Sequence, residues 1–211
     1  MLQVDGLSKS YHGRTVLAPV RFCLPAGFCL GVTGGTGAGK STLLRLVAQI
    51  EKPDSGTICY QGKDILGDRD FLRSHVGYVP QHNDLMEDLT VAAQLKLWQS
   101  ACGLSGDFPQ EIMDLLDITP MLKTRIKNLS GGMQRRVSIA MALMTNPEIL
   151  ILDESTNALD AGYRQVFMEY LEKYLQRGGR ILFCSHDPAE LNRLCGSFLH
   201  LENGHVQHKT T

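Results

Sequence analysis

Nine consecutive residues have the types and the spacing that a loop needs to hold a chain of phosphate groups. They are Gly34, Gly35, Thr36, Gly37, Ala38, Gly39, Lys40, Ser41 and Thr42, and they fit the pattern G-x-x-x-x-G-K-[ST]. Glycines let successive backbone N–H groups point at one anion, and Lys40 adds a positive charge for the β- and γ-phosphates. The Ser41 hydroxyl is a ligand for Mg²⁺. These residues predict that the chain binds a nucleoside triphosphate.

The residues on either side of this loop are typical of a strand and a helix. Residues 28–32 form an apolar run, which predicts a strand. Apolar residues then recur at helical spacing at Leu43, Leu44, Leu46, Val47 and Ile50. A helix that begins at the loop adds the positive end of its dipole to the phosphate site. The alternative is a glycine-rich turn that binds nothing, and the strand, the Lys-Ser pair and the helix together argue against it.

Two adjacent carboxylates follow a second apolar run. Asp153 and Glu154 come directly after residues 149–152, which read as a buried parallel strand. The carboxyl ends of such strands are where open α/β sheets bind ligands. We expect Asp153 to hold Mg²⁺ and Glu154 to polarise the water that attacks the γ-phosphate. The alternative is an acidic strand end that faces solvent.

A third motif opens a predicted helix. Ser130 is a natural N-cap, and Gly131 and Gly132 leave the backbone N–H groups behind it uncovered. The motif is therefore a candidate for a second anion site. Taken alone, it is more often simply a capped helix.

Composition and charge limit the classes of protein to which the chain can belong. The chain has 211 residues, 43% hydrophobic and 20% charged, with a net charge of −1. Because no basic block is present, we expect no nucleic-acid partner. No run approaches the roughly 20 apolar residues of a membrane span, so we expect a cytosolic protein or one on the cytosolic side of a membrane. The six cysteines lack C-x-x-C spacing, which favours small buried hydrophobes in a reducing compartment over a metal centre.

Strand-like and helix-like runs alternate along the chain, which predicts parallel strands joined by crossover helices. The segment up to residue 24 reads as β-rich. Further strands are expected at 57–60, 75–79, 149–152 and 180–184, a crossover helix at 166–175, and a closing hairpin at 198–201 and 205–207. Residues 85–144 show helical periodicity. This middle third reads as a helical insertion between two halves of an α/β core.

The ordered set of motifs resembles that of the ATP-binding cassette (ABC) ATPases. Residues 130–133 resemble the signature sequence of that family. The other family motifs follow in the expected order over essentially the whole chain, at Tyr11, Gln81, Asn157-Ala158-Leu159-Asp160 and His186. The resemblance implies that Tyr11 stacks on adenine, that Gln81 senses Mg²⁺ and the attacking water, and that His186 contacts the γ-phosphate. Their ordinary alternatives are a half-buried strand residue, a solvated loop amide and a surface histidine.

The resemblance also implies a fold. It is an α/β fold with a P-loop NTPase core, which has a mainly parallel sheet flanked by helices and an N-terminal antiparallel β part. A single ABC ATPase domain, 1–211, would contain this core over 1–84 and 146–211. A helical subdomain would be inserted over 85–145.

The implied mechanism needs two such domains. They pack head to tail around two ATP molecules, each held by Lys40 of one subunit and by Ser130, Gly131 and Gly132 of the other, with Asp160 in the loop that crosses the interface. Glu154, His186 and Gln81 would be catalytic, and Ser41, Gln81 and Asp153 would hold Mg²⁺. The expected partners are a second ABC ATPase subunit, identical or not, and a transmembrane transporter subunit on a separate chain. The complex would lie at the cytoplasmic face of the cell membrane.

Other functions remain open within this resemblance. A soluble ABC ATPase acting on the ribosome or on DNA is the weaker alternative, because those usually carry two cassettes or a long coiled coil. Intact Glu154 and His186 argue against a sensor that binds ATP without hydrolysis. Met133 followed by Arg135 and Arg136 resembles export-type signatures, so export is favoured over an importer motor. Ser155 departs from the proline usual after the glutamate, and we expect activity to survive because no reacting group is lost.

Overall fold

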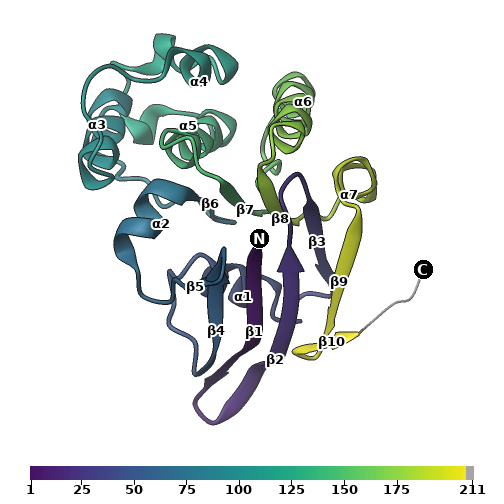
Figure 1. The fold of residues 1–211 in the computed structure, drawn as a ribbon. Helices are drawn as coiled ribbons and strands as arrows, with labels where there is room; N and C mark the ends of the chain where they lie inside the picture. Colours follow the sequence, from purple (N-terminus) through teal and green to yellow (C-terminus); the bar gives the residue numbers. More distant parts are fainter. Residues whose placement is uncertain (208–211) are drawn as a thin grey trace.

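The computed structural model describes residues 1–207 and contains two sheets (Figure 1). The first is antiparallel, in the order β2-β1-β4-β5, with β1 (Leu2–Tyr11), β2 (Arg14–Leu24), β4 (Ser55–Tyr60) and β5 (Lys63–Asp64). The second has the order β10-β9-β3-β8-β7-β6, with β3 (Cys29–Gly34), β6 (Val76–Val79), β7 (Ile149–Asp153), β8 (Arg180–Cys184), β9 (Ser197–Glu202) and β10 (His205–Gln207). All its pairs are parallel except β9 with β10. The predicted fold class is confirmed.

The helices are α1 (Lys40–Val47), α2 (Arg69–His75), α3 (Val91–Ala101), α4 (Gln110–Leu115), α5 (Gly131–Leu143), α6 (Ala161–Gln176) and α7 (Pro188–Leu194). Helices α1 and α2 lie on the connections between the two sheets, and the other helices lie on the connections between strands of the second sheet. Two 3₁₀ turns, Thr119–Met121 and Ile126–Asn128, lie between α4 and α5. Figure 1 shows α3, α4 and α5 grouped together on the opposite side of the molecule from β1 and β2.

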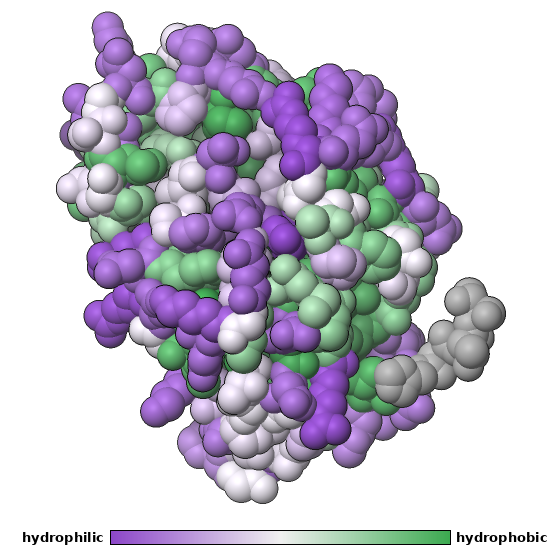
Figure 2. Space-filling view, viewed as in Figure 1, coloured by the Kyte–Doolittle hydropathy of each residue, from purple (hydrophilic) through white to green (hydrophobic). Residues whose placement is uncertain are grey.

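Alternate residues of the parallel strands belong to two different cores. On β7, Ile149 and Ile151 pack with α1 and the antiparallel sheet, while Leu150 and Leu152 pack with the helices on the other face. Every residue of β7 and β8 is buried, which explains their continuous apolar runs. On the molecular surface seen in Figure 2, apolar side chains gather right of centre and polar side chains surround them.

Most predicted elements are confirmed, with boundaries shifted by a few residues. The closing hairpin forms with Asn203 and Gly204 in its turn, both at positive φ (48° and 80°), as a two-residue primed turn requires. One expectation is wrong: Ile50 lies beyond α1 and is 65% exposed, because Gln49 turns left-handed (φ 53°) and ends the helical path. Helix α2 was not predicted, since none of its residues is buried and it carries no apolar stripe.

The close approach of α5 to β6 depends on the absence of a side chain at Gly77. A Cβ there would lie 2.4 Å from the Ala142 carbonyl oxygen and 2.8 Å from Leu150 Cδ2. Gly77→Ala should therefore lower the free energy of unfolding by about 1–3 kcal/mol, measured by urea unfolding. Gly162→Ala is the control, because Gly162 is exposed on α6 and its nearest neighbour would be 3.4 Å away. Equal stabilities for the two variants would contradict this account of the packing.

Candidate active site

A cavity of about 210 Å³ lies at the carboxyl edge of the parallel sheet. Its lining residues come from the phosphate loop, from the ends of three other parallel strands and from β2: Thr36, Gly37, Gly39, Lys40, Ser41, Thr42, Gln81, Glu154, His186 and Val16. The loop follows β3, Gln81 follows β6, Glu154 follows β7 and His186 follows β8. Parallel pairing places these strand ends side by side. The tertiary fold thus brings together motifs that lie more than a hundred residues apart in the sequence.

The phosphate loop has the backbone conformation that its glycines predict. Gly34, Gly37 and Gly39 have φ values of 141°, 76° and 100°. Two of them also allow close backbone contacts, since a Cβ would lie 2.2 Å from Leu201 O at Gly34 and 2.8 Å from Val16 O at Gly39. Side chains are therefore excluded at these positions by both torsion and space.

Lys40 is bound to its own loop. It is 8% exposed, and its Nζ donates to the carbonyl oxygens of Gly34 at 2.9 Å and Gly35 at 3.0 Å. The loop thus holds a cation at its centre with the backbone wrapped around it. An anion that enters the loop would offer Nζ stronger, charged acceptors than these two carbonyls.

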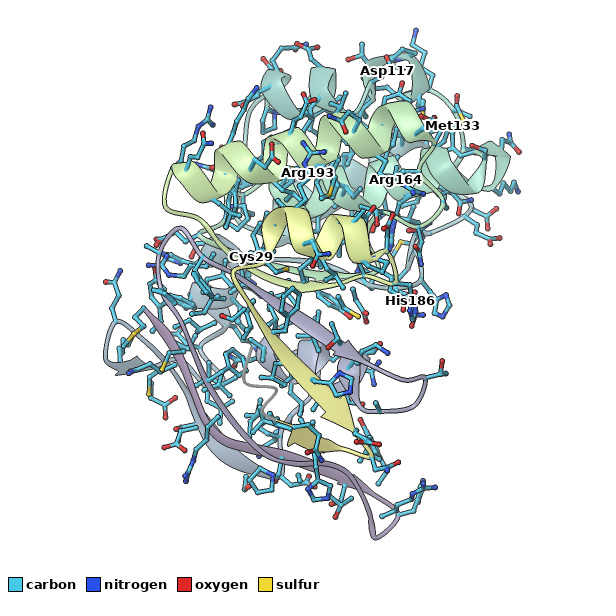
Figure 3. The ribbon with its side chains drawn as sticks, turned by 90° about the vertical axis from the view of Figure 1, so that its right-hand side faces the viewer. Cys29, Asp117, Met133, Arg164, His186 and Arg193 are labelled. Atoms are coloured by element: carbon cyan, nitrogen blue, oxygen red, sulfur yellow. The ribbon has the colours of Figure 1, made fainter. Side chains whose placement is uncertain are left out.

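Glu154 is the centre of a polar network at the cavity. Its Oε2 accepts hydrogen bonds from Gln81 Nε2 at 3.2 Å and from Asn157 Nδ2 at 2.9 Å. Its Oε1 lies 2.6 Å from His186 Nε2. The carboxylate is buried, whereas the His186 side chain is 58% exposed at the open edge of the molecule (Figure 3). The network fixes the direction of the Glu154 carboxylate and leaves it facing the cavity.

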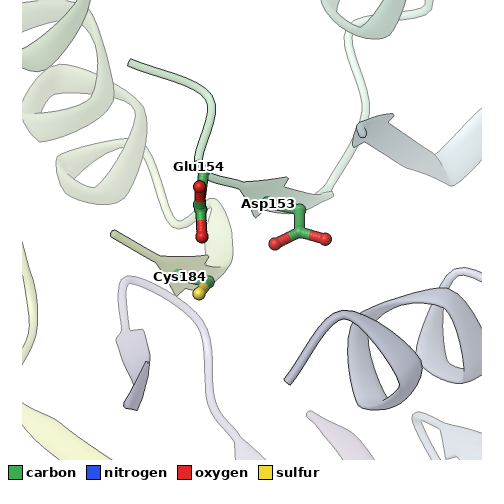
Figure 4. Close-up of side chains that lie close together, drawn as sticks. All are labelled: Asp153, Glu154 and Cys184. Atoms are coloured by element: carbon green, nitrogen blue, oxygen red, sulfur yellow. The ribbon is translucent and has the colours of Figure 1, made fainter. Parts of the chain in front are cut away.

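Asp153 is a buried acid with an unsatisfied oxygen. It is 1% exposed, and Oδ1 has no hydrogen-bond partner within residues 1–207. Desolvation raises its pKa, and a hydrogen bond from Ser41 opposes that rise. Figure 4 shows the carboxylates of Asp153 and Glu154 leaving the end of β7 in different directions. A buried, unpaired carboxylate oxygen beside a serine hydroxyl is a donor set that suits Mg²⁺.

Cys184 lies beside these two acids, with its Sγ within 4.8 Å of a carboxylate oxygen of each (Figure 4). Burial and the charge of Asp153 raise the pKa of Cys184 to about 12. At neutral pH the group is therefore a protonated thiol. Cys184 behaves here as the small buried hydrophobe that the sequence predicts.

Glu154 also has an unusual backbone. Its φ is 51°, in the left-handed region that a side chain disfavours. The next residue, Ser155, is fully buried, and its hydroxyl has no partner in the described part of the chain. The carbonyl groups around this bend are bound by Arg135 of α5. From the sequence, Arg135 had a place only in the export-type signature, although its spacing of four from the apolar Ile139 indicates a buried position.

Glu190 ties together the loops that follow β7 and β8. Its Oε2 accepts hydrogen bonds from Thr156 Oγ1 at 2.8 Å and from Ser185 Oγ at 2.6 Å. One hydroxyl is two residues from Glu154 and the other is next to His186. This residue was not predicted, because nothing in the sequence shows that a glutamate on α7 is buried.

Several predicted site residues do not line the cavity. The Tyr11 hydroxyl donates to Glu51 Oε1 at 2.5 Å. Ser130 caps α5, with its Oγ accepting from the Met133 N–H at 3.2 Å, and Asp160 caps α6. A Cβ on Gly132 would lie 2.7 Å from Ala158 O, so the N-terminus of α5 packs against the loop that ends at Asp160. Ser130, Gly132 and Asp160 thus form a separate group outside the cavity. Gly34, Gly35, Ala38, Gly131 and Asp153 are not in the lining either, but Gly34, Gly35 and Ala38 belong to the loop that forms it and Asp153 directly precedes Glu154.

A sequence model of the ABC transporter family matches residues 17–157. The chain belongs to the ABC transporter family. It is 36% identical over 207 residues to the Nod factor export ATP-binding protein I of Sinorhizobium fredii. That alignment covers 96% of this chain and 60% of the relative, so the chain spans well under two thirds of the relative's length.

Solved structures of the family share the fold of this ABC chain. The structure of an ATP-binding subunit of an ABC transporter superposes with a TM-score of 0.90 at 30% identity, covering 100% of this chain and 90% of that one. A bacterial ABC transporter cassette solved as a dimer superposes with a TM-score of 0.86 at 25% identity, covering 99% and 97%. Among the described residues, no helix has both the length and the apolar character to cross a membrane.

The unpaired Asp153 carboxylate should destabilise the nucleotide-free protein. The pKa of Asp153 in the folded protein is raised above 3.8, so its buried charge lowers the free energy of unfolding at pH values above that raised pKa. This loss of stability disappears as the pH falls to the pKa of Asp153 in the unfolded chain. Asp153→Asn should raise Tm at pH 7 by roughly 2–4 °C for each kcal/mol relieved. The gain should vanish below about pH 4.

Thermal unfolding without nucleotide over this pH range measures the effect. Asp107→Asn is the control, since Asp107 is exposed and its replacement should leave Tm nearly unchanged. A variant at Asp153 that melts at or below the parent temperature at pH 7 contradicts the assignment of a destabilising carboxylate.

Proposed function

We propose that this chain is the ATP-hydrolysing motor subunit of an ABC transporter. The observation that carries the proposal is the convergence of the phosphate loop, Gln81, Glu154 and His186 on one cavity. A phosphate-binding loop alone supports nucleotide binding. A buried, oriented carboxylate facing the same cavity adds the group that hydrolysis requires.

Each residue in the cavity has a proposed part in the reaction. The loop N–H groups and Lys40 bind the β- and γ-phosphates, with Lys40 exchanging its two loop carbonyls for phosphate oxygens. Glu154 orients and polarises the attacking water, because its carboxylate is held facing the cavity. His186 lies 2.6 Å from that carboxylate and lines the cavity, where it would contact the γ-phosphate as well as Glu154.

Mg²⁺ is the expected metal. The Ser41 hydroxyl, the Asp153 carboxylate and the Gln81 amide oxygen would hold it, and it would neutralise charge on the phosphates. The unsatisfied Asp153 Oδ1 supports this assignment. Tyr11 is proposed as the adenine-stacking residue, and it lies at the end of β1, outside the cavity lining.

The group at the N-terminus of α5 supports a dimer. Ser130, Gly131 and Gly132 offer backbone donors outside the cavity of their own subunit. A second copy or a sister subunit packed head to tail would place this group on the γ-phosphate bound by Lys40, with Asp160 in the loop at the seam. The γ-phosphate would then favour the closed state and its loss the open one. The dimeric bacterial cassette with the same fold supports this arrangement.

A membrane chain is the proposed partner, and export the proposed direction. The similarity to a relative named for Nod factor export supports both. A mainly apolar groove of about 190 Å³ lies between α1, α2, α3, β6 and α5, and exposed Ile50 and Trp98 line it. An apolar segment of a membrane-spanning chain would fit there, at the cytoplasmic face of the membrane. Arg73 at the groove favours an acidic residue in that segment.

The Glu154→Gln variant separates binding from hydrolysis. The amide keeps the size of the side chain and removes its negative charge, so turnover should fall by roughly 10²–10⁴-fold while ATP still binds. The variant should accumulate as an ATP-bound dimer in size-exclusion chromatography. Lys40→Ala is the contrast, because it should lose ATP affinity and remain monomeric. Turnover at the parental rate in Glu154→Gln would refute the role of this carboxylate.

The groove can be tested with exposed residues that leave the active site intact. Ile50→Asp should keep the parental Tm and ATPase rate, because Ile50 is 65% exposed, and should reduce retention of the tagged chain in the membrane fraction at least roughly tenfold. Leu97→Asp is the matched control, since Leu97 is 47% exposed on α3 but does not line the groove. Equal retention of both variants would show that the groove is not the docking site.

A further inference from the structure

Arg135 is a buried cation behind the catalytic edge of the sheet. It lies on α5, which Figure 1 shows above β6 and β7, and only 2% of its surface is exposed. Every nitrogen of its guanidinium group donates a hydrogen bond. A fully buried arginine is rare unless its charge and donors are satisfied.

The partners of Arg135 are mainly backbone carbonyls at the ends of two strands. Nε donates to Ser155 O at 2.9 Å, and Nη2 donates to Glu154 O at 2.6 Å and to Asp153 O at 3.2 Å. Nη1 donates to Pro80 O at 2.5 Å and to Asn83 Oδ1 at 3.2 Å. Pro80 directly precedes Gln81. One planar group therefore holds the backbone on both sides of the Gln81–Glu154 hydrogen bond.

These contacts explain how Glu154 keeps its left-handed backbone. The φ of 51° turns three successive carbonyls, those of residues 153–155, toward one point. Converging carbonyl dipoles repel one another unless a cation lies among them. Such a conformation persists at a non-glycine residue only when its surroundings impose it. The guanidinium group supplies that constraint.

The burial of this charge is unfavourable by itself. Desolvation lowers the pKa of Arg135 to about 10, and the nearby charges of Asp153 and Glu154 oppose the shift. The group stays protonated at neutral pH. An apolar side chain would fill the same space without a buried charge, so packing alone does not account for an arginine here.

We propose that Arg135 is a positioning residue that links the second anion site, at Ser130, to the catalytic carboxylate of Glu154. The inference rests on the proposed function. Ser130 caps α5 and Arg135 follows five residues later, about 7.5 Å along the same helix. A helix moves as a rigid unit, so engagement of the Ser130 end by the partner's nucleotide shifts the guanidinium group. The shift is passed through the carbonyls of residues 153–155 to Glu154, and through Pro80 to Gln81.

The neighbouring Arg136 provides a matched control. It is also buried on α5, at 7% exposure, and donates to Leu116 O at 3.2 Å and to Asp117 Oδ2 at 3.4 Å. Its guanidinium carbon lies 4.1 Å from the centre of the Tyr163 ring. Arg136 is thus also buried and hydrogen-bonded, but its partners directly follow α4 or lie on α6 rather than at the catalytic edge. A lysine at either position keeps the charge and loses the planar fork.

The experiment compares Arg135→Lys with Arg136→Lys in the full chain. Both should bind ATP with parental affinity and lower Tm to a similar degree. Only Arg135→Lys should lose kcat, by roughly 10- to 100-fold with KM for ATP nearly unchanged, because Glu154 is then misplaced. It should also form a longer-lived ATP-bound dimer in size-exclusion chromatography than either the parent or Arg136→Lys.

Two outcomes overturn the inference while leaving the proposed function intact. One is a parental kcat in Arg135→Lys. The other is an equal loss of kcat in both variants, which would indicate a general effect of stability. If the lysine variant does not fold, Arg135→Gln tests the same point. This substitution removes the buried charge but keeps two amide donors. A parental kcat in Arg135→Gln overturns the inference as well. A parent chain that neither hydrolyses ATP nor dimerises refutes the proposed function instead.

Discussion

The structure depends on the parallel pairing of β3, β8, β7 and β6. Parallel strands end at the same edge of a sheet, so the residues that follow each strand become neighbours without any further device. Four strands deliver the phosphate loop, His186, Glu154 and Gln81 to one cavity. Burial of both faces of β7 and β8 makes this edge rigid, since neither strand can shift without exposing apolar side chains.

The functional edge also contains features that are unfavourable for folding. Asp153 is a buried carboxylate with an unpaired oxygen, and Glu154 has a left-handed backbone. Such features reduce stability and persist when the surrounding structure compensates for them. The compensation comes from other elements: Arg135 on α5 binds the carbonyls around Glu154, and Glu190 on α7 holds the hydroxyls of Thr156 and Ser185.

Two groups of backbone donors lie in different parts of the molecule. The phosphate loop faces the cavity and has Lys40 bound to its own carbonyls, whereas the N-terminus of α5 does not line the cavity. A single chain with both groups can use the second only on a ligand that it does not hold itself. This division is the structural reason why the proposed reaction needs two subunits, and it gives α5 a place in the mechanism beyond that of a packing helix.

The sequence by itself determined the local features, because these depend on short-range chemistry. The glycines of the phosphate loop, the apolar run before Asp153 and the Asn203-Gly204 turn each predict a conformation from a few adjacent residues, and the structure has them. The burial of both faces of β7 follows from its continuous apolar run.

Only the tertiary structure decided which side chains meet across long separations. Arg135 and Glu190 are ordinary charged residues in the sequence, and their burial beside residues 153–155 and beside Thr156 and Ser185 arises from how α5 and α7 pack on the sheet. The exposed position of Ile50 was likewise not predicted, because a helical apolar pattern does not show at which residue the helix ends. Long-range packing sets these contacts, and no periodicity within one segment encodes it.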